Sequence, residues 1–149
     1  MLQDAASATL STCEVLFNEA VNGAGASLTH SSQLQSTNTH WTGNKASQLG
    51  AALHAIDSSA VSLQSSSLSH NQATDGAAVF ATDACVIMLD NCNVTSHHAQ
   101  VHGAMLVSGN AQLSISAGTV SHNTGEQSGA LFASDDAQLT MQSMVCQHN

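Results

Sequence analysis

Basic side chains are almost absent from this sequence. Lys45 is the single lysine and there is no arginine, against ten acidic residues and a formal charge of −9 at pH 7. Nucleic acids and anionic membranes are held mainly by Lys and Arg side chains that neutralise phosphates. We therefore expect no nucleic-acid partner, whereas divalent metal ions and cationic partners are electrostatically permitted.

Long apolar runs, proline and tyrosine are also absent. A membrane-spanning helix needs about 18 or more consecutive apolar residues, so we expect no membrane insertion. The opening MLQDAASATL lacks the basic region of a signal peptide, so we expect no signal peptide in this chain. Charged residues make up only 7% of the sequence, but its apolar share of 42% argues against disorder. We expect one folded domain over residues 1–149.

A unit of about 26 residues repeats along the chain. SHNQATDGAAVF at 69–80 returns as SHHAQVHGAMLV at 96–107 and as SHNTGEQSGALF at 121–132. Asparagine and glycine mark this period independently, with His97 in the place of one asparagine; the positions are Asn18, Asn44, Asn71, Asn123 and Asn149, and Gly23, Gly50, Gly76, Gly103 and Gly129. A repeat of this length indicates a solenoid.

Within each unit the apolar residues alternate with period two, as in strands that bury one face. Three positions before each asparagine or His97 stand Val15, Trp41, Leu68, Val94, Val120 and Cys146, and three positions after each glycine stand Ala26, Leu53, Val79, Leu106 and Phe132. These columns predict three short strands per unit in a right-handed parallel β-helix of about five to six coils. The hand follows the general preference of parallel crossovers. We expect the asparagines to hydrogen-bond from coil to coil.

The motifs GAAVF, GAMLV, GALF, LSHN and VSHN resemble the GGA[ILV] and FxxN repeats of chlamydial polymorphic outer membrane proteins. More broadly, they are similar to right-handed β-helix domains of the pectate-lyase-like superfamily. The resemblance implies an extracellular or cell-surface module, either an adhesin-like stalk or a domain that binds or cleaves polysaccharides. Lyases of this superfamily use an Arg or Lys base beside calcium-binding carboxylates. Only Lys45, in an expected turn, is available here.

A polar column follows each glycine by seven residues: His30, Asp57, Asp83, Asn110 and Asp136. We expect Asp57 and Asp83 to lie about 5 Å apart on adjacent coils. Paired carboxylates can hold calcium or another divalent cation, or act as the acid and nucleophile of a glycoside hydrolase. Aspartate is also a common turn residue that hydrogen-bonds nearby backbone, so a structural role stays open.

A second column, one position before the asparagines, contains His70, His122 and His148. Imidazoles along one edge can bind zinc, although no ligand spacing such as HExxH occurs. Exposed turn histidines without a metal are the alternative interpretation.

Hydroxyl side chains form two outward columns, and flat hydroxyl arrays can bind glycans or ice. The columns are Thr42, Ser69, Thr95 and Ser121, and Thr9, Ser62, Ser114 and Thr140. An ordinary polar sheet surface is the alternative. Asn93 begins the one glycosylation sequon, Asn93-Val94-Thr95, which matters for a chain secreted by a eukaryote.

The four cysteines, Cys13, Cys85, Cys92 and Cys146, form no CxxC pair, which argues against a zinc ribbon or a thioredoxin-like site. We expect all four to be small buried apolar residues, with Cys13 and Cys92 in one column. Their redox state stays open.

These patterns favour a non-enzymatic structural or surface-interaction module, adhesin-like or glycan-binding, with an extracellular or cell-surface location. We expect no cofactor, with calcium or zinc as the open alternatives, and glycans or other copies of the repeat as partners. Two other functions stay open: a polysaccharide-active hydrolase-like domain that uses Asp57, Asp83 and Asp136, and a divalent-metal-binding repeat. Solenoid ends expose strand edges, so we also expect a segment of a longer repeat protein or pairing through the ends.

Overall fold

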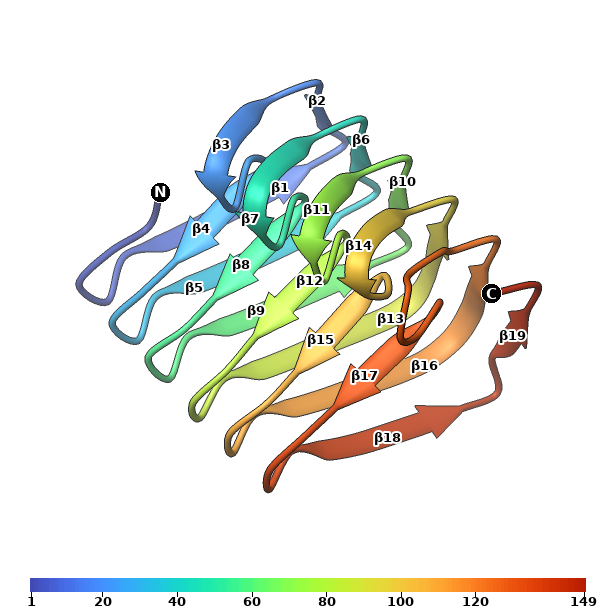
Figure 1. The fold of residues 1–149 in the computed structure, drawn as a ribbon. Coiled ribbons are helices and arrows are strands. Elements are labelled where there is room, and N and C mark those ends of the chain that lie inside the picture. Colours follow the sequence, from blue (N-terminus) through green and yellow to red (C-terminus); the bar gives the residue numbers. More distant parts are fainter.

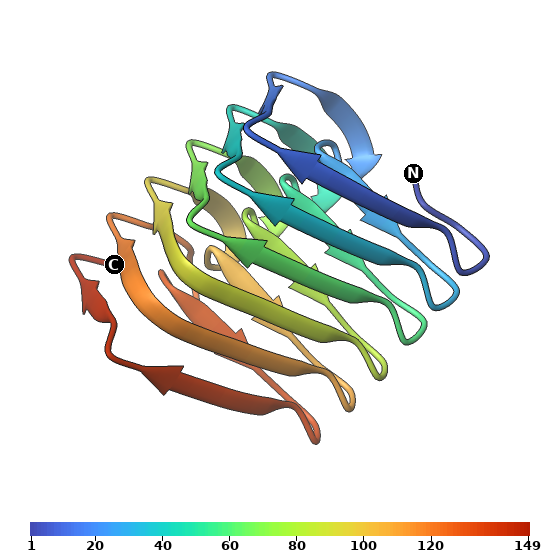
Figure 2. The same cartoon turned by 180° about the vertical axis from the view of Figure 1, so that it is seen from behind.

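The computed structural model describes all 149 residues and contains strands and no helix. The chain winds as a right-handed solenoid of about five turns, with the two termini at opposite ends of its axis (Figures 1 and 2). All strand pairs are parallel, and each coil adds to the same three sheets. The predicted all-β parallel β-helix is therefore confirmed. No helix capable of crossing a membrane is present.

The ten-stranded sheet bends at a corner into a long arm and a short arm. The long arm contains β1 (Ser7–Ser11), β5 (Gln33–Thr37), β9 (Ala60–Gln64), the first half of β13 (Val86–Thr95), the first half of β16 (Gln112–Ser121) and β18 (Gln138–Gln142). The short arm contains β2 (Glu14–Leu16), β6 (His40–Thr42), β10 (Ser67–Ser69), the second halves of β13 and β16, and β19 (Val145–Gln147).

Two smaller sheets complete each coil. The four-stranded sheet consists of β3 (Glu19–Asn22), β7 (Lys45–Leu49), β11 (Gln72–Asp75) and β14 (His98–His102). The five-stranded sheet consists of β4 (Ala26–Leu28), β8 (Leu53–Ala55), β12 (Val79–Ala81), β15 (Met105–Val107) and β17 (Leu131–Ala133). The chain then turns back into the next long-arm strand (Figure 2).

The core is a set of stacked columns that run along the solenoid axis. Leu34 pairs with Val61, Val61 with Ile87, and Ile87 with Leu113, and all four are buried. Trp41, Leu68, Val94 and Val120 form a second column on the short arm, as the sequence predicts. Burying each such side chain contributes about 1.5–3 kcal/mol, so these columns are the main stabilising term.

Trp41 is a large, fully buried residue, and the coil before it leaves room for its ring. A Cβ atom on Gly25 would lie 3.1 Å from Trp41 Cε3 and 2.5 Å from the Ala52 carbonyl oxygen. Glycine at position 25 therefore permits close approach of both the ring and the next coil.

Small residues fill the narrow part of the interior beside the four-stranded sheet. Ala46, Ala51, Ala73, Ala77 and Ala99 form a separate buried cluster of alanines. Gly50 turns the chain there at a φ of +56°, and a Cβ on it would lie 2.3 Å from the Leu53 carbonyl oxygen. Ala51 and Ala77 directly follow glycines and are fully buried, because this part of the interior is too narrow for larger side chains.

The asparagine ladder (Asn18, Asn44, Asn71, His97, Asn123 and Asn149) follows the inner side of one corner. Asn44 Nδ2 donates to Asn71 Oδ1 at 3.0 Å, and the Asn44 backbone N–H donates to the same oxygen at 2.8 Å. Each buried amide also donates to a carbonyl near the preceding rung, as Asn71 Nδ2 does to Trp41 O at 2.8 Å. The predicted stacking from coil to coil is confirmed.

His97 replaces an asparagine without interrupting the backbone contacts of this ladder. Its Nδ1 accepts the Asn71 N–H at 3.1 Å, and its Nε2 lies 3.0 Å from the Leu68 carbonyl oxygen. These two partners require a neutral ring protonated on Nε2. Burial lowers the pKa of His97 to about 4, which keeps the ring neutral at pH 7.

The predicted column through Leu106 and Phe132 is wrong by one residue. Val79 pairs with Met105, and Met105 pairs with Leu131, so these residues point inward instead. The register shifts in the preceding sheet, where Asp75 pairs with His102 although Ala73 pairs with Ala99. The extra residue in β14 displaces Gly103, and the chain recovers its register before Met105.

The expectation of four buried cysteines is wrong for two of them. Cys85 and Cys92 are buried, whereas Cys13 is half-buried and Cys146 is exposed. Cys13 and Cys146 belong to the first and last coils, which have a neighbouring coil on one side only. All four thiols are free.

Candidate functional site

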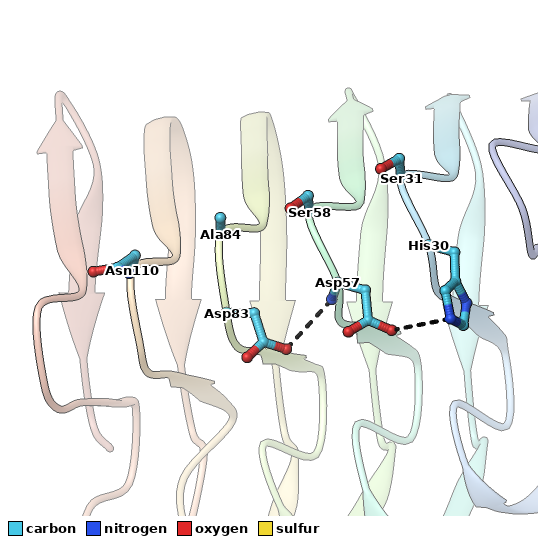
Figure 3. A pocket seen from close by; sticks show the side chains of 7 residues that line it. All are labelled: His30, Ser31, Asp57, Ser58, Asp83, Ala84 and Asn110. Carbon is cyan, nitrogen blue, oxygen red and sulfur yellow. Dashed lines mark hydrogen bonds and ion pairs between the residues drawn. The ribbon is translucent and has the colours of Figure 1, made fainter.

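The candidate acidic site lies in the turns that connect the five-stranded sheet to the long arm. His30, Asp57 and Asp83 occupy equivalent turn positions with left-handed backbone, at φ values of 54°, 56° and 60°. Aspartate tolerates this conformation better than most residues, which explains its recurrence here. Together with neighbouring serines these residues line an open groove of about 580 Å³ (Figure 3).

The carboxylates in this groove join one turn to the next. Asp83 Oδ2 accepts the backbone N–H of Asp57 at 3.4 Å. Asp57 Oδ2 lies 3.9 Å from His30 Nε2, with the two side chains 43% and 59% exposed (Figure 3). Such exposed ion pairs contribute about 0–1 kcal/mol. The groove therefore brings together an imidazole and two carboxylates, each in contact with solvent.

Asp136 is not the third member of this column, contrary to the predicted spacing. Asp135 has the left-handed backbone, with a φ of 57°, and its Oδ2 accepts the Gly109 N–H at 3.2 Å. This contact repeats the one between Asp83 and Asp57, so Asp135 is the equivalent residue. Phe132 is displaced for the same reason. The predicted positions are counted from the repeated glycines, and the last two, Gly103 and Gly129, lie one residue later in their coils than the earlier glycines do.

His70, His122 and His148 all occupy the left-handed corner position before the asparagine ladder, and all are exposed. The rings of His122 and His148 lie 5.2 Å apart between centroids, whereas Ser96 occupies this position on the coil between His70 and His122. No group of three or more His, Cys, Asp or Glu side chains is arranged to hold a metal ion. The interpretation as a zinc site therefore rests on a pair of imidazoles.

The remaining candidate residues lie apart from the groove. Lys45 begins β7 and is exposed, so the expectation of a turn at this position is wrong. Asn93 is exposed on the outer side of β13, two residues before the half-buried Thr95. Burial raises the pKa of Cys85 to about 11 and also raises that of Cys92, which disfavours the reactive thiolate of either residue.

A polar cluster between the four-stranded and five-stranded sheets was not identified from the sequence. His102 Nδ1 lies 2.7 Å from Asp75 Oδ1, and His102 Nε2 lies 3.1 Å from Gln127 Oε1. The His102 ring packs against Phe132, with 4.0 Å between centroids. Asp75 and His102 stand 27 residues apart and pair only through the extra residue of β14. The alternation of 26- and 27-residue spacings was the one signal of this contact in the sequence.

The Asp75–His102–Gln127 cluster connects three successive coils, and both ring nitrogens of His102 lie within hydrogen-bonding distance of its other two members. Asp75 Oδ1 also accepts the His102 backbone N–H at 3.1 Å. The arrangement therefore stabilises the irregular register rather than presenting a free acid or base.

No family model, curated protein or solved structure matches the chain. The parallel β-helix itself is established by the strand pairing. The resemblance to chlamydial outer-membrane repeats and to the pectate-lyase-like superfamily stays a prediction.

Proposed function

We propose that this protein is a non-enzymatic β-helix module that acts by surface interaction, binding glycans through its regular outer faces. The observation that carries the proposal is that acidic side chains of the turns hydrogen-bond to the backbone of the neighbouring coil. Asp83 and Asp135 each accept a backbone N–H from the preceding turn, and so serve the stacking of coils. A glycoside hydrolase needs two carboxylates free to face one scissile bond.

An extracellular or cell-surface location belongs to the same proposal. The resemblance to surface-exposed repeats supports it, as does a surface poor in charge and rich in Ser, Thr, Asn and Gln. Free thiols at Cys13 and Cys146 are compatible with either redox environment, because neither residue has a cysteine partner.

The hydrolase-like function is the second candidate, and the groove at His30, Asp57 and Asp83 is the observation that favours it. The three side chains lie on adjacent coils within reach of one extended ligand (Figure 3). Calcium binding in the same groove would support this candidate, since two carboxylates and a neighbouring asparagine supply oxygen ligands.

One experiment separates the two candidates. The purified chain is incubated with a panel of neutral and acidic polysaccharides, and both the retained protein and the release of reducing ends are measured. The proposal predicts retention without release, and unchanged retention for Asp83→Asn. Release of reducing ends that Asp83→Asn abolishes would refute the proposal and establish the hydrolase-like function.

Thermal unfolding with calcium or zinc tests the metal-binding alternative. A metal that binds only the folded chain at about 100 times its dissociation constant adds roughly 2.7 kcal/mol to stability. We expect no shift of the melting temperature with either ion. A calcium shift lost in Asp83→Asn would assign the groove to a cation, and a zinc shift lost in His122→Ala would assign the histidine corner.

A further inference from the structure

The outer side of the long arm is a flat surface whose composition differs from the rest of the protein. Its six strands pair in the order β1, β5, β9, β13, β16 and β18, and each presents three outward side chains. This long-arm face comprises Ser7, Thr9, Ser11, Gln33, Gln35, Thr37, Ala60, Ser62, Gln64, Val86, Met88, Asp90, Gln112, Ser114, Ser116, Gln138, Thr140 and Gln142. At ~4.8 Å between strands, it extends roughly 24 Å along the solenoid axis. Figure 2 shows its strands side by side.

The long-arm face is nearly free of charge although the protein carries −9. Asp90 is its one ionisable side chain, so nine of the ten acidic residues lie elsewhere, many of them in turns. The surrounding carboxylates repel an anionic polymer. A neutral polymer can cover the face with little loss of hydration from charged groups, because the face has almost none.

The polar side chains of the long-arm face have free hydrogen-bonding capacity. Ser116 Oγ donates to Asp90 Oδ1 at 2.7 Å, and this is the one side-chain hydrogen bond between residues of the face. On the short arm, by contrast, two pairs of outward side chains bind one another: His40 Nδ1 lies 2.6 Å from Ser67 Oγ, and Thr42 Oγ1 lies 2.9 Å from Ser69 Oγ. Six glutamines of the long-arm face keep both amide donors and the carbonyl acceptor for a ligand.

An apolar strip lies near the middle of this polar surface. Val86 and Met88 on β13 are 37% and 49% exposed, and Ala60 on β9 pairs with Val86. An apolar centre with polar surroundings matches a ligand that has C–H faces as well as hydroxyl groups. A protein partner fits less well, because the face contains neither an aromatic residue nor an arginine, the residues that dominate protein interfaces.

We infer that the long-arm face binds an extended neutral polysaccharide, with sugar C–H groups against Val86 and Met88 and hydroxyl groups at the surrounding glutamines and serines. The inference rests on the surface-interaction function proposed above and names its ligand class and its site. Aligned chains of such a polymer would lie across the strands, where equivalent side chains recur on every coil.

Retention on insoluble and immobilised polysaccharides tests this inference. The probes are microcrystalline cellulose, chitin and amylose resin as neutral polymers, and immobilised polygalacturonate as an anionic one. Met88→Asp places a carboxylate at the centre of the face, and Gln35→Glu replaces one amide by a carboxylate of the same shape. Asn93→Asp is the matched control, because Asn93 is exposed on the same strand as Met88 but beyond the corner. The melting temperature of each variant verifies folding.

We expect retention on at least one neutral polymer and none on polygalacturonate. Met88→Asp should weaken retention roughly tenfold or more, since a carboxylate must lose water beneath the ligand, and Gln35→Glu by a smaller factor. Asn93→Asp should bind as the parent does.

Binding to a neutral polymer that all three variants retain would overturn the assignment to this face and leave the surface-interaction function standing. Failure of the parent chain to bind any neutral polymer, or preference for polygalacturonate, would overturn the inference itself. Depolymerisation of the bound polymer would instead refute the non-enzymatic function.

Discussion

The asparagine ladder and the long-arm face both consist of polar side chains that recur once per coil, yet they use those side chains differently. In the ladder, Asn44 and Asn71 direct their amides to neighbouring coils and are buried. On the long-arm face, Gln35, Gln64 and Gln112 are exposed, and their amides have no partner in the chain. In the ladder, where the side chains hold the coils together, the same residue type recurs. On the long-arm face, the residue type at equivalent positions varies from coil to coil. The difference indicates which columns hold the fold and which are free to bind.

Removing one rung of the ladder should have the largest effect. Asn71→Ala deprives the Asn44 backbone N–H and side-chain amide of their acceptor and removes the side-chain donor to the Trp41 carbonyl. Each buried polar group left unpaired costs about 1–3 kcal/mol, so we expect a loss of roughly 3–5 kcal/mol. Urea unfolding followed by circular dichroism measures it. A loss below about 1 kcal/mol would show that the ladder is dispensable.

His97 makes the same ladder sensitive to acid. Its pKa is about 4 when folded, against the ordinary 6.5, so the unfolded chain binds more protons between these values. Stability is complete above pH 6.5, decreases as the pH falls toward 4, and reaches a total loss of about 3 kcal/mol.

His97→Asn provides the comparison for this prediction. Unfolding free energies at pH 7 and pH 4 should show that the variant loses about 3 kcal/mol less than the parent over this interval. At pH 7 the two should be similar, since asparagine supplies the same acceptor and donor. Equal acid sensitivity of parent and variant would mean that His97 is not the responsible group.

The Asp75–His102 contact should have an intermediate effect, because it is half-buried and its counterpart, the hydrogen bond from the Leu49 N–H to Asn22 Oδ1, recurs at one other pair of coils rather than in every coil. Asp75→Ala removes the acceptor of both the His102 ring and its backbone N–H. We expect a loss of about 1–3 kcal/mol, together with faster amide exchange in β14. Hydrogen exchange followed by mass spectrometry locates the effect. Unaltered exchange in β14 would contradict the role assigned to this contact.

Shortening a side chain of the long-arm face should have the smallest effect on stability. Gln35 is exposed and makes no side-chain hydrogen bond, so Gln35→Ala should change the free energy of unfolding by less than about 0.5 kcal/mol. Its melting curve should superimpose on that of the parent. A larger loss would mean that the long-arm face contributes to the fold as the ladder does.

The sequence predicts the β-helix and most of its columns because apolar residues recur at equivalent positions about every 26 residues. Trp41, Leu68 and Val94 recur at one position of the repeat and form one buried column, and the asparagines mark one corner of every coil. Local departures from the period are not readable in the same way. An extra residue lengthens the spacing in both β7 and β14, but the positions that follow are displaced only after β14, which the spacing does not reveal; Leu106, Phe132 and Asp136 are therefore displaced by one position in the prediction.

The predicted site residues show the same limit. Asp57 and Asp83 are correctly placed on adjacent turns, because the strands on either side of these turns pair without a register shift. The contact of His102 with Asp75 and Gln127 depends on the irregular part, and the sequence does not predict it. The sequence overestimates the burial of Cys13 and Cys146, because a repeating apolar position does not distinguish an end coil, which has one neighbour, from an internal coil.

Thermal unfolding of the parent and of Met88→Asp in increasing concentrations of soluble oligosaccharides of cellulose, chitin and amylose tests most directly whether the fold and the binding surface are separable. Without oligosaccharide, both proteins should melt at the same temperature, since Met88 lies outside the core columns. With at least one of the three, binding to the folded state should raise the melting temperature of the parent progressively and leave that of Met88→Asp unchanged. Equal shifts for the two proteins, or no shift for the parent, would contradict the account.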